Sequence, residues 1–231
     1  GEDLAGIHSL RTIKDADTLR AALAVGDSVL IVGAGFLGLE VAFSLSSFGA
    51  NVSVVAPEQH PLEAQFGRAF SDRLIRMMKD AGITWMPGTS VRELVGDGSI
   101  VRATLEDHQT IDATTVVVAA GITTAGLPEG LAELTDNHGM IVDRRFCTAD
   151  PDIYAAGDML AGESHAGHWV TAMRQGWYVG QVMLGTDRPY RDPPFFWSDL
   201  PGGTLRAVGH PSGRTPVAVH GSIEVGEFLA I

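Results

Sequence analysis

The sequence of 231 residues has a single cysteine, no long apolar run and no excess of basic residues. One cysteine, Cys147, excludes an internal disulfide, which is typical of proteins in a reducing compartment. The longest apolar runs are too short to span a bilayer, and no signal-peptide pattern occurs. The formal net charge of −12 disfavours general nucleic-acid binding. These absences favour a cytoplasmic protein that binds neither membrane nor nucleic acid.

What the chain does have is glycine, at 28 positions, and an apolar fraction of 45% that suits an ordered α/β core. The apolar run 28–32 ends in Gly33-Ala34-Gly35-Phe36-Leu37-Gly38, and apolar residues then recur at helical spacing at Leu37, Val41, Leu45 and Phe48. In a strand–turn–helix, the three glycines of G-x-G-x-x-G permit the tight turn, the approach of backbone to a pyrophosphate and close helix packing. A second strand is predicted at 51–55. The pattern predicts a dinucleotide-binding turn, and a purely structural strand–helix corner is the alternative.

Further elements are predicted along the chain from periodicity and turn residues. Helices are predicted at 18–24, 70–81 and 170–184. Strands are predicted at 83–86 and 115–120, with a hairpin of 99–105 and 110–112 and short β segments after the prolines near 189–194. Met173, Trp177 and Met183 are interpreted as core residues of the last helix.

A second motif, Thr148-x-x-x-x-Ile153-Tyr154-Ala155-Ala156-Gly157-Asp158, reads as an apolar strand that carries a carboxylate to a glycine turn. Alone it could be an ordinary Gly-Asp turn. Together with the first glycine turn and the strand that ends at Gly121, it resembles the two-dinucleotide flavoprotein reductases, the pyridine nucleotide-disulfide oxidoreductase superfamily. The resemblance implies that the first turn binds NAD(P)H and that Asp158 contacts the ribityl–pyrophosphate region of FAD.

Four shorter patterns, at 6–12, 35–40, 168–176 and 196–199, are similar to the ferredoxin/rubredoxin reductase group, and to apoptosis-inducing factors and monodehydroascorbate reductases. This resemblance implies an α/β fold: a three-layer, Rossmann-like NAD(P)H-binding domain at 1–121, part of an FAD-binding domain at 122–188, and the start of an α+β interface domain at 189–231. Members of the family carry an earlier G-x-G-x-x-G for the adenosine side of FAD, which is not found here. We therefore expect a segment of a longer enzyme that does not hold FAD tightly alone.

The motif and the resemblance together assign cofactor-binding roles to individual residues. A ribose-binding carboxylate is expected at the end of the second strand, and the nearest acid there is Glu58, which would favour NADH over NADPH unless it is only a solvated loop residue. By resemblance, Glu40 faces the nicotinamide pocket, and Trp169 and Trp197 lie near the flavin and nicotinamide rings. The alternatives are first-turn helix electrostatics for Glu40 and core packing for the tryptophans. The predicted cofactor-binding residues are Gly33, Gly35, Phe36, Leu37, Gly38, Glu40, Glu58, Gly121, Gly157, Asp158, His168, Trp169 and Trp197.

No catalytic side chain is assigned, since hydride transfer itself needs no acid or base. The grouping of Glu163, His165 and His168 lacks a metal-site spacing, so no metal is predicted. The absence of C-x-x-C argues against a thioredoxin-reductase type. The predicted function is an FAD-dependent NAD(P)H oxidoreductase that prefers NADH and serves a ferredoxin-like or rubredoxin-like carrier. The alternatives are a nucleotide-binding module without turnover or a reductase of another acceptor, and a homodimer is compatible with either.

Overall fold

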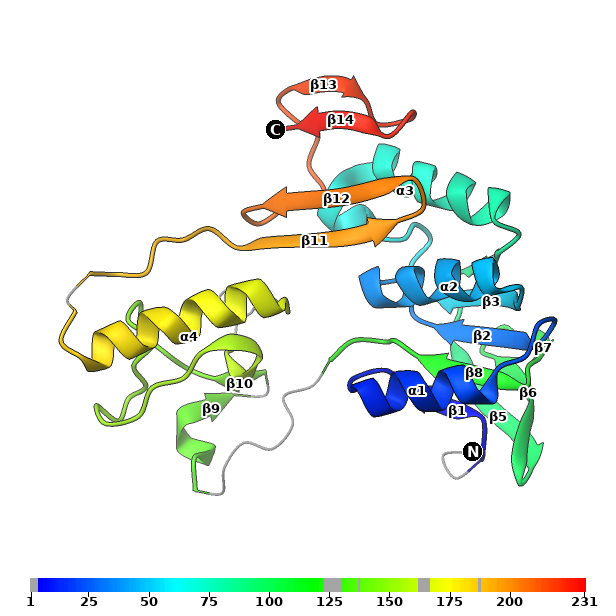
Figure 1. Ribbon diagram of the computed structural model, residues 1–231, viewed down its shortest axis with the longest axis horizontal. Coiled ribbons are helices and arrows are strands. Elements are labelled where there is room, and N and C mark those ends of the chain that lie inside the picture. Colours follow the sequence, from blue (N-terminus) through cyan, green and yellow to red (C-terminus); the bar gives the residue numbers. More distant parts are fainter. Residues whose placement is uncertain (1–3, 123–129, 137, 162–166, 187) are drawn as a thin grey trace. The chain divides into compact units, whose positions relative to one another are not determined.

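The computed structural model describes residues 4–122, 130–136, 138–161, 167–186 and 188–231 (Figure 1). The described chain forms two compact units, unit 1 of residues 1–121, 198–205 and 211–231, and unit 2 of residues 122–197 and 206–210. The predicted three-domain division at 121/122 and 188/189 stays a prediction.

The helices are α1 (Ile13–Ala22), α2 (Phe36–Phe48), α3 (Glu63–Asp80) and α4 (Trp169–Met183), with 3-10 turns at Ala132–Leu134 and Gly157–Met159. The strands are β1 (Ile7–Ser9), β2 (Ser28–Val32), β3 (Asn51–Ala56), β4 (Thr84–Pro87), β5 (Val91–Asp97), β6 (Ser99–Leu105), β7 (Thr110–Asp112), β8 (Thr115–Val118), β9 (Thr135–Asp136), β10 (Gly139–Met140), β11 (Phe195–Leu200), β12 (Gly203–Val208), β13 (Val219–Ser222) and β14 (Glu227–Ala230).

The core of unit 1 is a five-stranded parallel sheet in the order β1-β8-β2-β3-β4. Side chains of a strand alternate between the two faces of its sheet. In β2, Val29 and Ile31 join the cluster packed against α1, α2 and α3, whereas Leu30 joins a second cluster with Ala103 and Leu105 of β6. Helices therefore cover one face and the three-stranded β5-β6-β7 sheet covers the other (Figure 1). This confirms the three-layer α/β class, with a central strand buried on both faces as its continuous apolar run predicts.

Helix α1 begins at Ile13, so the predicted start at residue 18 is wrong. The Thr12 hydroxyl accepts a hydrogen bond from the Asp15 backbone N–H at 3.2 Å, and the Asp15 carboxylate accepts from the Thr12 backbone N–H at 2.7 Å. This capping box satisfies N–H groups that a helix start leaves unpaired. Hydrogen bonds from the backbone N–H groups of Thr12 and Arg11 lower the pKa of the Asp15 carboxyl.

Helix α3 begins at Glu63, seven residues before the predicted start at residue 70, because a kink divides it. Gly67 has a φ of +78°, inside the left-handed region that glycine tolerates. The amphipathic pattern covers only the part after this kink, where Phe70, Leu74 and Met78 are buried. Sequence periodicity could not extend across a residue with non-helical backbone angles.

The last residues of unit 1 pack on α3. An ideal Cβ built on Gly213 would lie 2.5 Å from the Glu63 carbonyl oxygen, so only glycine fits this approach to the first turn of the helix. In the β13–β14 hairpin, the Glu224 carbonyl accepts a hydrogen bond from Arg73 Nη1 at 2.6 Å. Phe228 stacks at a tilt on Phe70, with ring centroids 6.2 Å apart. Residues 211–231 are therefore part of unit 1, although they are far in sequence from its parallel sheet.

The predicted β6–β7 hairpin is confirmed, but the sequence reading missed β5, which pairs antiparallel with β6. Two register shifts interrupt this pairing, and most β5 residues are exposed. A strand with charged, solvent-facing residues and bulges lacks the regular alternation that predicts strands.

Unit 2 has far less regular structure around its core, which includes Met140, Phe146, Leu160, Tyr178 and Val182. The predicted strand before Gly157 is wrong, because the structure has only an isolated bridge between Cys147 and Tyr154 there. The core interpretation of Met173, Trp177 and Met183 is also wrong, since each is more than half exposed. Among the described helices, none combines the length and apolar character that crossing a membrane requires.

Candidate nucleotide-binding site

The glycine turn of unit 1 has the geometry that each glycine was predicted to provide. Gly33 has a φ of +110°, and an ideal Cβ on it would lie 2.4 Å from the Ala119 carbonyl oxygen at the end of β8. An ideal Cβ on Gly38 would lie 2.1 Å from the Gly33 carbonyl oxygen. Both contacts are with backbone atoms, which cannot move aside as a side chain can. Gly33 and Gly38 are therefore required for the turn itself.

Gly35 differs from the other two glycines, because no atom outside its own chain neighbours lies within 4 Å of an ideal Cβ there. Its φ is an ordinary −73°, so its backbone conformation does not require glycine. It is the N-cap residue of α2, and no side chain caps this helix end. Uncapped N–H groups at the start of a 13-residue helix attract a phosphate anion. Open space beside uncapped helix N–H groups is the kind of position at which a pyrophosphate binds.

Residues at the carboxyl ends of two neighbouring strands lie beside this turn. The Ala119 N–H donates to the Val32 carbonyl at 2.8 Å, which places the β8 end, and Gly121 beyond it, along β2. Strand β3 is parallel to β2 with Val55 opposite Val32, so Glu58 follows at the same edge of the sheet. Ligands of open parallel sheets bind at this edge. Glu58 is exposed there, which suits contact with a ribose, and its role stays a prediction.

Glu40 makes two contacts that sequence reasoning missed. Its Oε1 accepts a hydrogen bond from the Ser198 hydroxyl at 2.5 Å and another from the Asp199 backbone N–H at 3.2 Å. Glu40 is the fifth residue of α2, and the first turn contains no acid, so the alternative of first-turn helix electrostatics is wrong. The only sequence signal for this link was that the patterns at 35–40 and 196–199 both belong to the same family resemblance. Two patterns of one family can lie close together in the folded chain.

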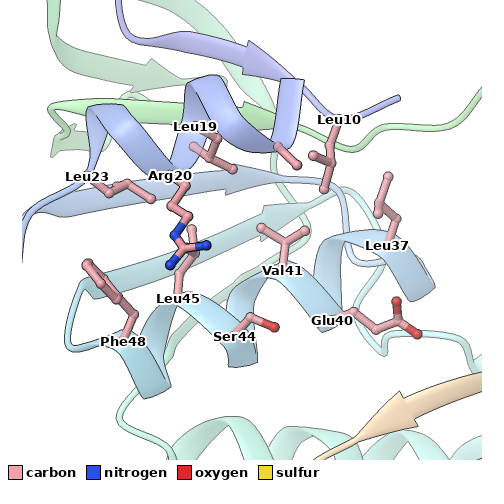
Figure 2. Close-up of a pocket in the computed structure, with 11 residues that line it drawn as sticks. Leu10, Leu19, Arg20, Leu23, Leu37, Glu40, Val41, Ser44, Leu45 and Phe48 are labelled. Carbon is pink, nitrogen blue, oxygen red and sulfur yellow. The ribbon is translucent and has the colours of Figure 1, made fainter. Parts of the chain in front are cut away.

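A groove of about 540 Å³ runs between α1 and α2 (Figure 2). The predicted helical series Leu37, Val41, Leu45 and Phe48 forms its α2 wall, and Leu19 and Leu23 belong to the α1 wall. Figure 2 shows Glu40 and Leu37 toward one end of α2 and Phe48 toward the other. Of the predicted cofactor-binding residues, only Leu37 and Glu40 line it. The glycine turn, rather than this groove, therefore defines the candidate nucleotide site.

The second glycine motif lies in unit 2. Gly157 has a φ of +78° and begins the 3-10 turn that contains Asp158. The Gly157 N–H donates to Gln175 Oε1 of α4 at 2.8 Å, and an ideal Cβ on Gly157 would lie 3.1 Å from the Ala172 methyl group. Gln175 is 3% exposed, and sequence reasoning did not assign it this role. Helix α4 therefore fixes the backbone that carries Asp158, in place of the expected strand.

Aromatic rings cluster around His168 at the start of α4. The His168 ring centroid lies 4.8 Å from that of Trp197 and 6.2 Å from that of Trp169, and the two tryptophan rings meet edge-to-face at 5.6 Å. His168 Nδ1 accepts a hydrogen bond from the Val170 N–H at 3.3 Å, so this ring caps the helix. Trp169 is 61% exposed, which disagrees with a core role. Such flat, accessible surface suits contact with a planar ring.

Glu163 and His165, from the grouping considered for metal binding, lie outside the described residues. Within the described part of the chain, no three His, Cys, Asp or Glu side chains gather as a metal site would require.

Two curated relatives match the chain along most or all of its length. A probable ferredoxin reductase of Castellaniella defragrans is 31% identical over all of this chain and 58% of its own length. A rubredoxin–NAD(+) reductase of Ectopseudomonas oleovorans is 30% identical over 90% of this chain and 56% of its own length. The chain therefore spans slightly more than half the length of these relatives.

A solved ferredoxin reductase of the CYP199A2 system from Rhodopseudomonas palustris is 28% identical, with a TM-score of 0.86 over 97% of this chain and 58% of that one. The model of the pyridine nucleotide-disulphide oxidoreductase family matches residues 1–176, which include both glycine motifs. FAD and NAD(P)H, the two cofactors predicted from those motifs, are the cofactors of this family. The chain is thus a member of the pyridine nucleotide-disulphide oxidoreductase family.

Proposed function

We propose that this chain is the nicotinamide-nucleotide-binding part of an FAD-dependent NADH oxidoreductase that reduces a small electron carrier. The glycine turn carries this proposal, because Gly33 and Gly38 shape a strand–helix corner that leaves Gly35 and the α2 N-terminus open to a pyrophosphate. Ferredoxin and rubredoxin appear in the names of the relatives, which supports a carrier of that type. The single cysteine supports a cytoplasmic location.

Different residues of the chain bind different parts of NADH and FAD. The first turn of α2 holds the dinucleotide pyrophosphate, and Glu58 accepts a hydrogen bond from the 2′-hydroxyl of the adenosine ribose. Asp158 meets the ribityl side of FAD, while Trp169 and Trp197 offer flat surface to the reacting rings. The chemistry that FAD supplies in such enzymes is the conversion of a two-electron hydride donor into a one-electron source. The protein contributes orientation, so no acid–base side chain is assigned.

Titration of NADH against the purified chain, followed by protein fluorescence, tests the nucleotide site. Saturable binding at or below millimolar NADH is the expected result. A chain that circular dichroism shows to be folded and that binds no NADH would contradict the proposal.

An absorption spectrum tests how the chain holds FAD. We expect FAD to wash out on dialysis, because the adenosine side of the cofactor has no second G-x-G-x-x-G to bind it, and each lost charge-assisted hydrogen bond costs roughly 1.5–3 kcal/mol. A chain that stays yellow, with a stoichiometric flavin band, would show that this expectation is wrong.

The alternative function is a nucleotide-binding module without turnover. NADH-dependent reduction of ferricyanide in the presence of added FAD separates the two functions. A rate above that of free FAD favours the enzyme, and a rate equal to it favours the binding module or a need for further polypeptide. The same assay with ferredoxin or rubredoxin distinguishes a carrier reductase from a reductase of another acceptor.

A further inference from the structure

A row of phenylalanine rings runs through unit 1. The rings of Phe36 and Phe66 meet edge-to-face, with centroids 5.7 Å apart. Phe66 and Phe70 follow at 5.3 Å, and Phe70 and Phe228 at 6.2 Å. All of these distances are typical of favourable aromatic pairs. The row begins at the first residue of α2, crosses α3 and ends in β14, so α3 lies between α2 and the β13–β14 hairpin (Figure 1).

The first ring of the row belongs to the residue beside the proposed pyrophosphate site. Phe36 follows Gly35, the N-cap residue of α2, and no side chain caps this helix end. The Leu39 N–H donates to the Gly35 carbonyl at 3.0 Å, which closes the first turn of the helix. Helix ends fray readily, and here no cap opposes it. A ring that packs on Phe36 from outside α2 therefore stabilises the turn that offers its N–H groups to a phosphate.

Phe66 belongs to a short part of α3 that the kink at Gly67 separates from the rest of the helix. Its N–H donates to the Leu62 carbonyl at 2.9 Å. The Gln65 carbonyl accepts a hydrogen bond from outside the helix, from the Gly213 N–H at 2.8 Å. A helical segment this short is not stable by itself. Its contacts with other parts of unit 1, including Gly213, therefore fix the direction in which the Phe66 ring points.

The other end of the row is supplied by residues 211–231. Phe70 is 4% exposed, and Phe66 and Phe228 pack against the same buried cluster. Close-packed interiors have low compressibility, so a displacement at Phe228 is passed through Phe70 to Phe66. Chains of packed side chains can couple distant sites energetically, and double-mutant cycles measure this coupling.

We infer that Phe66 is a positioning residue for nucleotide binding, through which residues 211–231 hold the first turn of α2 in its phosphate-binding conformation. This inference rests on the proposed nucleotide site at the start of α2. Phe66 acts through Phe36 and not by direct contact with the nucleotide. The Leu39 amide reports the first turn in the absence of nucleotide, so the coupling and the nucleotide site can be tested separately.

Amide hydrogen exchange at Leu39 and NADH titration of the whole chain test the inference. Phe66→Leu keeps an apolar side chain but removes the ring. In this variant Leu39 should exchange about three- to tenfold faster, and NADH should bind more weakly by a similar factor.

Val52→Ala is the matched control. Val52 is 3% exposed in the same buried cluster, but it pairs with Val29, at the other end of β2 from the glycine turn. The variant should lower the thermal midpoint while Leu39 exchange and NADH affinity keep their wild-type values. Equal changes in Val52→Ala and Phe66→Leu would overturn the inference, as would a Phe66→Leu chain with unchanged Leu39 exchange or unchanged NADH affinity.

A double-mutant cycle distinguishes positioning from ordinary packing. Phe228→Leu alone should speed Leu39 exchange by a smaller factor than Phe66→Leu, and it should add nothing once Phe66→Leu is present. Effects of the two substitutions that simply add would overturn the route through Phe66. A wild-type chain that binds no NADH would contradict the proposed nucleotide site, and the Leu39 exchange rates would then decide by themselves whether residues 211–231 hold the turn.

Discussion

The two glycine motifs of this chain lie in unequal surroundings. In unit 1, the turn from Gly33 to Gly38 joins a strand with neighbours on both sides to a helix packed on the same sheet. In unit 2, the Gly157–Asp158 turn is held chiefly by α4, through Gln175 and Ala172. The comparison teaches that the first turn is supported by its own parallel sheet, including the Ala119 carbonyl at the end of β8, whereas the second turn depends on contacts with one helix.

The largest expected effect is the loss of the first site in Gly38→Ala. The new methyl carbon would lie 2.1 Å from the Gly33 carbonyl oxygen, so either the turn or the helix must shift. Overpacking against backbone costs about 1–3 kcal/mol or more. We expect a lower thermal midpoint and no saturable NADH binding by fluorescence titration.

Gly35→Ala is the matched control for that substitution. Its methyl group meets no protein atom, so the fold should keep the thermal midpoint of the wild type while NADH binds more weakly. If Gly35→Ala lost as much thermal stability as Gly38→Ala, Gly35 would face protein atoms. It would then not be the open, nucleotide side of the turn.

The second expected effect is confined to unit 2. Gln175→Ala leaves the buried Gly157 N–H without its acceptor, which costs about 1–3 kcal/mol. Amide hydrogen exchange should speed up around Gly157 and α4, while NADH affinity in unit 1 stays unchanged. Gln181→Ala, on the same helix, supplies the control for simple helix effects. Unchanged exchange around Gly157 in Gln175→Ala would show that the second turn is as self-supporting as the first.

This contrast also explains how far the sequence could be read. The β2–turn–α2–β3 unit was predictable because its signals are local: a short apolar run, glycine spacing and helical periodicity. The capping box that starts α1 was recognisable in principle, from Thr12 and Asp15. The Glu40–Ser198 hydrogen bond joins residues that are 158 positions apart in the sequence, and hydrophobic periodicity cannot predict such a contact. The exposure of Trp177 was unpredictable because helical spacing shows that an apolar face exists but not whether anything covers it.

A smaller effect concerns the choice of nucleotide at the first site. Glu58→Gln should narrow the preference for NADH over NADPH by about tenfold, because the neutral amide no longer repels a 2′-phosphate and 1.4 kcal/mol corresponds to a factor of about ten. Paired titrations with both nucleotides measure the ratio. Glu63→Gln removes a charge from the nearby start of α3 and should leave it unchanged. An unaltered ratio in Glu58→Gln would make Glu58 a solvated loop residue.

The smallest effect is a pH dependence of α1. The pKa of Asp15 is lowered from its ordinary value of 3.8, chiefly by the backbone N–H groups of Thr12 and Arg11. A carboxyl with a lowered folded pKa stabilises the fold above its unfolded pKa, and this stabilisation is lost as the pH falls through the folded value. Thermal midpoints followed from about pH 5 to about pH 2 should therefore fall less in Asp15→Asn than in the wild type. Parallel curves for the two proteins would exclude a contribution from the capping box.

The packing of residues 211–231 on α3 has a consequence for synthesis. During translation, Arg73 can donate to the Glu224 carbonyl, and Phe70 can contact Phe228, only after more than 150 further residues have been added to the chain. A ribosome adds about 5–20 residues per second, so this side of α3 in the nascent unit 1 stays uncovered for on the order of ten seconds. The two segments of unit 2, residues 122–197 and 206–210, are made during that interval, between the three segments of unit 1. A premature stop near residue 210 would therefore damage the first unit of the chain, although its glycine turn was translated long before.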